Sequence, residues 1–285
     1  MGIAVVTPSY RADASLCSEL NSSVMEFLPS AQHFILVDRH DRARFQHLVG
    51  RRTVVLRSED VLPRGFVRIP GSRRWICPWT PRPIGGWLMQ QIIKIAYATL
   101  AEEEVLLLID SDTCLVRTIN SVGLASDGRV AFYARPGGIT EDMSAHLTWY
   151  QNACRLLGVA PQAPPVNDYI SSIVPWKRSV VKSMVARVED ATGEKWWKAV
   201  ARTVQFSEYL LYGTFVDQVL GGTAGLQRDE SDHCLAHWDL RPLGLDEVEQ
   251  FVGRFGAGDF ACLISSHSGT SPVVRQRVMA ALRVS

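Results

Sequence analysis

Hydrophobic and polar positions along the first hundred residues follow two alternating patterns. Short apolar runs at 3–6, 33–37 and 53–56 are typical of strands. Between them, apolar residues recur at helical spacing from about residue 13 and again over 87–100. Strands that alternate with helices predict a mainly parallel sheet with helices on both faces. The chain is therefore expected to have an α/β fold.

A continuous apolar run at 105–109 ends in Asp110, as expected of a strand buried on both faces. The pattern beyond it is more mixed. Periodicity predicts helices at 141–157, 177–190, 194–203, 207–220, 245–255 and 272–283, and short strands at 129–134, 171–174 and 260–265. No internal repeat divides the chain. We therefore expect one domain over 1–285 with a more helical C-terminal half.

Composition and charge exclude several classes of protein. The 285 residues are 47% hydrophobic and 21% charged, with 30 basic and 29 acidic side chains. A disordered chain would be poorer in apolar residues, and a nucleic-acid binder that relies on bulk charge would be more basic. The near-neutral total hides a segment at 63–86 with five arginines and no acid, Arg64, Arg68, Arg73, Arg74 and Arg82. Its prolines and glycines predict a loop.

Membrane-spanning and secreted classes also find no support in the sequence. No apolar stretch approaches the roughly 18 residues of a membrane span, and the N-terminal apolar run is too short for a secretory signal. The six cysteines contain no CxxC pair, which is typical of reduced thiols. We expect a cytoplasmic protein. The closing helix at 272–283 could touch a membrane surface, although packing on the domain is the commoner fate of such a helix.

The strongest chemical signal is the sequence Asp110-Ser111-Asp112 at the end of the predicted buried strand. Open α/β sheets bind ligands at the carboxyl ends of their strands. Two carboxylates there can share a divalent cation, and that cation can hold a diphosphate. An ordinary turn is the alternative. A dehalogenase-type phosphatase fits less well, because Cys114 stands where its motif needs threonine or valine.

The segment 105–113 resembles the DxD region of GT-A glycosyltransferases. Further matches run over nearly the whole chain: 7–10, Asp38, 84–94, 169–172, Trp176, 206–213 and 238–243. In order and spacing they are similar to a little-characterised bacterial family of GT-A-like glycosyltransferases. This resemblance implies a Rossmann-like GT-A domain, with a nucleotide-sugar-binding half at 1–118 and an acceptor-binding half at 119–285. It also implies transfer of a sugar, in polysaccharide biosynthesis, from a UDP- or GDP-linked donor.

The resemblance implies a set of donor-binding residues, namely Thr7, Pro8, Tyr10, Asp38, Gln91, Lys94, Asp110 and Ser111. Asp110 and Asp112 would bind Mn²⁺ or Mg²⁺, and GT-A enzymes often add a late histidine. His267 and His237 are the two candidates, and either could equally be structural. Lys94 and the arginines of 63–86 could neutralise the departing diphosphate.

An inverting transferase also needs a general base, and Glu208 is our candidate because partial burial can raise its pKa. A first-turn residue behind the N-cap Ser207 is the alternative. Asp168, Trp176 and Trp238 are expected on the acceptor side, where indoles can stack on sugars, although packing remains an alternative for each. The acceptor would be a glycan, a lipid-linked sugar or a small molecule, and an anionic acceptor would explain the arginines.

Two other functions remain open from the sequence. A nucleotidyl- or phosphotransferase would also use a metal and phosphate contacts. A non-catalytic protein could hold an anionic polymer on the arginine and tryptophan side chains of 63–86. That third reading leaves the strand-end carboxylates unexplained, and we expect no nucleic-acid partner.

Overall fold

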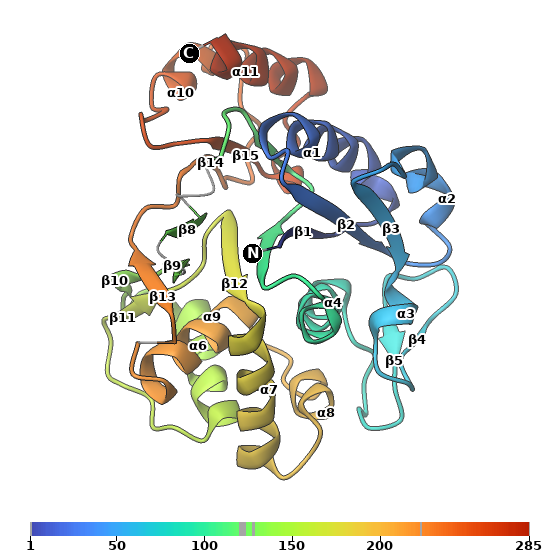
Figure 1. Ribbon diagram of the computed structural model, residues 1–285, viewed down its shortest axis with the longest axis vertical. Coiled ribbons are helices and arrows are strands. Elements are labelled where there is room, and N and C mark those ends of the chain that lie inside the picture. Colours follow the sequence, from blue (N-terminus) through green and yellow to red (C-terminus); the bar gives the residue numbers. More distant parts are fainter. Residues whose placement is uncertain (1, 120–123, 127–128, 223, 285) are drawn as a thin grey trace.

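A five-stranded sheet forms the centre of the computed structural model, which describes residues 2–119, 124–126, 129–222 and 224–284 (Figure 1). Its order is β12-β6-β1-β2-β3. The strands are β1 (Ile3–Pro8), β2 (Ala31–Val37), β3 (Thr53–Arg57), β6 (Val105–Ile109) and β12 (Ile173–Lys177). All pairs are parallel except β12 with β6. This arrangement confirms the predicted α/β fold.

Helices cover both faces of this sheet. Figure 1 shows α1 (Ala14–Phe27) on one side and α4 (Gly86–Leu100) on the other. Because β6 lies on the opposite side of β1 from β2, the chain reverses direction across the sheet after β3 and returns through α4. The carboxyl ends of β1, β2, β3 and β6 therefore meet at one edge, beside the N-terminus of α4.

Short elements connect these strands. They are η1 (Arg11–Asp13), α2 (Arg42–Phe45), η2 (Gln46–Leu48) and α3 (Ser58–Val61). The segment 63–86 was predicted to be a loop, and it differs by containing a small hairpin of β4 (Val67–Arg68) and β5 (Trp75–Ile76). Each strand has only two residues, too few for a detectable alternation of apolar and polar positions.

The second half is more helical, as predicted. Its helices are α6 (Ser144–Leu157), α7 (Arg178–Thr192), α8 (Trp196–Ala201) and α9 (Glu208–Thr214), which continues as a π-helical turn over Phe215–Val219. Small sheets accompany them, formed by β8 (Ala125–Ser126), β9 (Arg129–Tyr133), β10 (Arg135–Ile139), β11 (Val166–Asp168) and β13 (Leu226–Asp229). The strand predicted at 171–174 is β12, which begins later and extends through Trp176.

The C-terminal segment builds a separate layer against the strand that follows Asp112. β7 (Thr113–Leu115), β14 (Cys234–His237) and β15 (Ala261–Ile264) form one sheet, covered by α10 (Val248–Val252) and α11 (Pro272–Val284). The turn η4 (Ser266–Ser268) follows β15. This layer has its own apolar cluster, distinct from the main core. Among the helices of the described residues, none is long and apolar enough to span a bilayer.

Candidate active site

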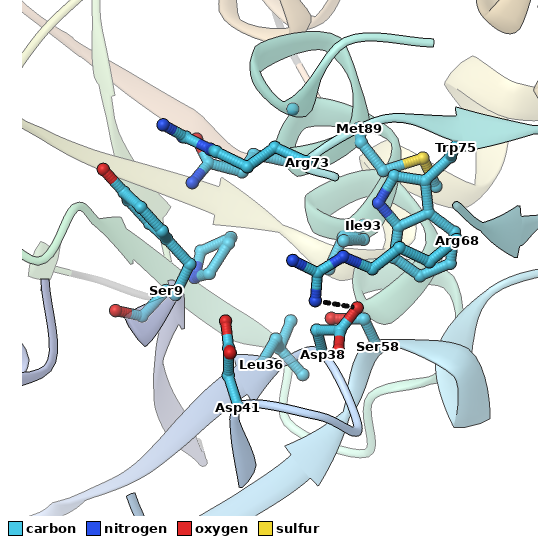
Figure 2. A pocket seen from close by; sticks show the side chains of 14 residues that line it. Ser9, Leu36, Asp38, Asp41, Ser58, Arg68, Arg73, Trp75, Met89 and Ile93 are labelled. Carbon is cyan, nitrogen blue, oxygen red and sulfur yellow. Dashed lines mark ion pairs between the residues drawn. The ribbon is translucent and has the colours of Figure 1, made fainter. Parts of the chain in front are cut away.

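A pocket opens where the parallel strands end. Pro8 ends β1 and is followed by Ser9 and Tyr10, Asp38 and Asp41 follow β2, and Ser58 follows β3. Figure 2 shows Ser9, Asp38 and Asp41 on one side of the pocket, with Arg68 and Arg73 reaching in from the other. The structure therefore brings the predicted residues Pro8, Tyr10 and Asp38 together at one pocket, with two arginines of 63–86.

The two arginines hold the pocket nearly closed. Arg68 Nη1 lies 2.5 Å from Asp38 Oδ2, and the Arg73 guanidinium lies 3.9 Å from the centre of the Tyr10 ring. Burial would raise the pKa of Asp38, but hydrogen bonds from Arg68 and His40 outweigh burial and keep that pKa below its ordinary value. The remaining space is about 50 Å³, well below the roughly 300–1,000 Å³ of ordinary ligand pockets.

Thr7 does not line this pocket with its side chain. Its hydroxyl donates a hydrogen bond to the carbonyl of Ile109 at 2.8 Å and lies 3.0 Å from Nε2 of the buried His33. Thr7 therefore links β1 to β6 inside the sheet. The predicted contact between its side chain and a nucleotide does not fit this position.

Lys94 is the centre of a second group of side chains, at the end of β6. It projects from α4, is 4% exposed, and places its Nζ 3.0 Å from Asp110 Oδ1 and 3.0 Å from Glu208 Oε1. The hydroxyl of Tyr209 lies 2.8 Å away. Burial would lower the pKa of Lys94, but the neighbouring acids outweigh burial and raise it well above its ordinary value. Lys94 is therefore a fixed positive charge.

Glu208 lies behind this lysine. Its residue is 3% exposed, and its backbone N–H donates to Gln91 Oε1 at 3.1 Å. Burial raises the pKa of Glu208, and the charge of Lys94 opposes that rise. A general base must reach an acceptor hydroxyl. In this arrangement the almost fully buried carboxylate is the counter-ion of Lys94, and the predicted role of Glu208 as a general base stays a prediction.

Asp110 and Asp112 differ in their surroundings. The Asp110 side chain is 49% exposed and faces open space beside Lys94, whereas Asp112 Oδ2 accepts a hydrogen bond from the backbone N–H of Ser266 at 2.9 Å. Burial, followed by the charge of Asp110, raises the pKa of Asp112. Between the two acids, the Ser111 hydroxyl donates to Ser9 Oγ at 2.9 Å. Ser111 thus ties the strand ends of β6 and β1 together.

Asp13 was missed by the sequence analysis. It ends η1, and burial followed by the charge of Asp112 raises its pKa to about 6, while Arg73 and His267 oppose the rise. Asp13 therefore lies in the electrostatic reach of both the strand-end acids and the arginine segment. In the sequence it is indistinguishable from a helix N-cap, and no spacing signal links it to Asp112.

The predicted metal site is only partly assembled. Carboxylates and imidazole are suitable donors for Mn²⁺, and His267 is exposed on η4 next to Ser266. However, Asp110 is already paired with Lys94. Among the described residues, no three His, Cys, Asp or Glu side chains form a group that could hold a metal ion. The donor types suit a metal, but their arrangement here does not fit one.

His237 has a backbone partner for one of its two ring nitrogens. Its Nε2–H donates to the carbonyl of Arg241 at 2.8 Å, and its buried ring packs against Phe251. The imidazole therefore holds the turn after β14. A histidine that ligates a metal commonly donates its other ring N–H in this way, so the role of His237 as a metal ligand through Nδ1 stays a prediction.

The three predicted acceptor residues occupy different environments. Asp168 ends β11, and burial raises its pKa while the nearby His146 opposes the rise. Trp238 is 55% exposed in the C-terminal layer. Trp176 is 0% exposed and stacks on Tyr212, with ring centres 5.2 Å apart. An indole without exposed surface cannot contact an acceptor, so Trp176 is a core residue and its predicted role does not fit.

The fold is that of GT-A glycosyltransferases. The structure of the galactosyltransferase LgtC in complex with donor and acceptor sugar analogs has a TM-score of 0.50 to this chain, with 10% sequence identity over 98% of this chain and 95% of that one. A second LgtC structure, of an active-site mutant, has a TM-score of 0.49 at 11% identity, over 97% and 95% of the two chains.

Sequence comparison identifies the family. The chain belongs to a family of unknown function, DUF6492, whose sequence model matches residues 3–230. No curated protein matches the chain in sequence.

Proposed function

We propose that this protein is a glycosyltransferase that moves a sugar from a nucleotide-diphosphate sugar to a hydroxyl acceptor. The main support is the position of Lys94, a buried cation held 3.0 Å from Asp110 at the end of β6. A diphosphate leaving group develops negative charge, and a preorganised cation in a poorly hydrated site stabilises that charge. The arginine-lined pocket at the neighbouring strand ends supplies the adjoining space.

The two halves of the chain would divide the work. The half at 1–118 would hold the donor, with Tyr10 and Asp38 near the nucleoside and Arg73 and Lys94 near the diphosphate. The half at 119–285 would contribute to the acceptor site, which would lie between the two halves. The acceptor hydroxyl forms the new bond to the anomeric carbon, the bond from that carbon to the diphosphate breaks, and the hydroxyl proton passes to a carboxylate or to the departing diphosphate. Glu208 would position Lys94.

Metal dependence is a separate part of the proposal. Mn²⁺ or Mg²⁺ was predicted on Asp110 and Asp112 with a late histidine. Since Asp110 is paired with Lys94, the remaining donors would be Asp112 and His267, which lie on adjoining turns joined by the Ser266 hydrogen bond. Because the described side chains do not form a metal site as they stand, we assign the diphosphate to the protein's own cations. The thermal-shift screen therefore tests each donor both with and without the metal.

A thermal-shift screen tests the proposal. UDP-, GDP-, dTDP- and CMP-linked sugars are added to the intact protein, with Mn²⁺ or with EDTA, because a ligand that binds only the folded state raises the melting temperature. We expect one nucleotide to stabilise the protein and Lys94→Met to remove that shift. Asp239→Asn, an exposed acid outside the pocket, is the matched control. Absence of a shift with every donor would contradict the proposal.

Product analysis separates the alternatives. A glycosyltransferase releases a nucleoside diphosphate, whereas a nucleotidyltransferase releases pyrophosphate and a phosphotransferase forms a phosphorylated product. If Asp112 holds a required metal, Asp112→Asn abolishes the metal-dependent release of nucleoside diphosphate and keeps the fold intact. Unchanged turnover of that variant would rule out Asp112 as a required metal ligand.

A further inference from the structure

A partly exposed group of aromatic rings lies beside the candidate active site. Trp87, on the first turn of α4, is 48% exposed, and its ring centre lies 5.2 Å from that of Trp149 on α6. The ring centre of His146 lies 4.8 Å from that of Trp149. We call these three residues the Trp87 platform. Folding usually buries a large indole, so a half-exposed one supported by two other rings needs an explanation.

Trp87 shares a helix face with Lys94. Trp87, Gln91 and Lys94 are spaced four and three residues apart along α4, so their side chains project from one side of the helix. Lys94 is the residue that contacts Asp110 and Glu208. Because α4 begins at the edge where the parallel strands end, Trp87 lies at the mouth of the site.

A groove with positive charge borders Trp87. It has a volume of about 620 Å³ and runs between the end of the arginine segment, the start of α4 and α8. Its lining includes Trp87, Arg82 and Arg202 but no acidic residue. Arg202 already binds Glu194 and the carbonyl of Trp79, whereas Arg82 is exposed on the groove wall. Gly85 and Trp87 line the groove and Gly86 lines the strand-end pocket, so the two sites adjoin.

We propose that this groove is the acceptor subsite, and that it binds a pyranose with an anionic substituent through stacking on Trp87 and an ion pair with Arg82. The inference rests on the proposed glycosyl transfer. The apolar face of a pyranose matches the exposed face of an indole. A guanidinium forms paired hydrogen bonds with a carboxylate or a phosphate, and it remains charged at any ordinary pH. The groove volume is within the range of sugar-sized ligands.

Saturation-transfer NMR tests the proposal with three simple probes. Glucose is the neutral ring, glucuronate adds a carboxylate, and glucose 6-phosphate adds a phosphate. With the wild-type protein we expect at least one anionic sugar to bind at least fivefold more tightly than glucose. Arg82→Gln should weaken that sugar about tenfold and leave glucose within twofold. Trp87→Ala should weaken every sugar that binds.

Two variants control for general effects. Arg277→Gln removes an exposed arginine of α11, and Leu100→Ala removes an exposed apolar side chain at the far end of α4, and neither residue lines the groove. Both should bind the probes like the wild type. The preferred anion identifies a carboxylate or a phosphate as the substituent, and equal preference for both still supports an anionic acceptor.

The proposal would be overturned by any of three results. The first is that no probe shows a saturation-transfer signal at millimolar concentration. The second is that glucose and both anionic sugars bind equally. The third is that Arg82→Gln or Trp87→Ala leaves sugar binding unchanged. Donor binding is measured on the same samples by the thermal-shift screen. If the sugars bind as expected but no nucleotide sugar does, the proposed transferase activity fails while the groove remains a sugar-binding surface.

Discussion

Lys94 combines two roles at the scale of a single residue. A cation this deeply buried is costly unless acids surround it, and Asp110 and Glu208 both lie within 3.0 Å of its Nζ. The same contacts that stabilise the charge during folding hold it rigidly at the end of β6. The negative charge of Glu208, fully inside the protein, therefore serves the site by fixing the lysine.

Removing the lysine should expose this dependence. Lys94→Met leaves the carboxylate of Glu208 buried without a partner, so we expect the free energy of unfolding to fall by about 3–5 kcal/mol. The double variant Lys94→Met with Glu208→Gln should recover at least half of that loss, because a neutral amide replaces the unpaired charge. Urea denaturation measures both. If Lys94→Met were as stable as the wild type, Lys94 would not be compensating the buried charge of Glu208.

His33 gives a residue-scale prediction for pH. Burial between Asn21 and Thr7 lowers its pKa from 6.5 to about 3. As the pH falls below 6.5, His33 becomes protonated in the unfolded chain but stays neutral in the folded one. The free energy of unfolding therefore decreases from pH 6.5 toward pH 3. His33 should account for a loss of about 1.6 kcal/mol between pH 6.5 and 5. His33→Gln should remove that part of the pH dependence of the free energy of unfolding, measured by urea denaturation. If the variant and the wild type show the same dependence on pH, the prediction is wrong.

At the scale of elements, the arginine segment acts as a cover on the strand-end pocket. β4 places Arg68 against Asp38, and Arg73 covers Tyr10. The space that remains is too small for a nucleoside, so donor binding as proposed requires the Arg68–Asp38 pair to open. An ion pair that must break reduces the apparent affinity by its own free energy.

Arg68→Gln should therefore free Asp38 for ribose hydroxyls. We expect uridine or guanosine to bind about fivefold more tightly to this variant, since a partly buried ion pair contributes roughly 1 kcal/mol. Nucleosides are the right probes because they have no phosphate for Arg68 to attract. Arg64→Gln, in the same segment but outside the pocket, serves as the control in calorimetry. Weaker nucleoside binding by Arg68→Gln would mean that the arginine belongs to the binding surface.

The elements that the sequence predicts well are those with local causes. β1, β2, β3 and β6 are apolar runs whose burial follows from their own residues. β10 has the sequence RPGGI, and it forms only because β11 pairs with it. The candidate site likewise combines contacts that local sequence predicts with contacts that it does not. Asp110 and Lys94 lie near one strand end in the sequence, but contacts of Asp38 with Arg68 and of Lys94 with Glu208 join distant segments that no periodicity connects.

At the scale of the whole molecule, the C-terminal layer completes a site that begins in the N-terminal half. The family match ends at residue 230, before β14, β15 and α11. Yet Ser266 donates its N–H to Asp112 Oδ2, and Arg275 Nη2 donates to the carbonyl of Asp112 at 3.2 Å. The layer is packed around a cluster of its own that includes Cys114, Phe251 and Leu282. Folding of this cluster therefore positions Asp112.

Phe251→Ala tests whether the layer can open separately. Loss of a buried phenyl group from a cluster this small should cost about 3–5 kcal/mol. Because the cluster is distinct from the main core, we expect hydrogen exchange to accelerate in β14, β15 and α11 while β1, β2 and β3 keep their protection. Nucleotide-sugar binding should also weaken in Phe251→Ala, since Asp112 loses its hydrogen bonds with Ser266 and Arg275. Val273→Ala, on the exposed face of α11, should change neither measurement. Uniform acceleration in both halves would instead show that the chain unfolds as one cooperative unit, with Asp112 held by the whole fold.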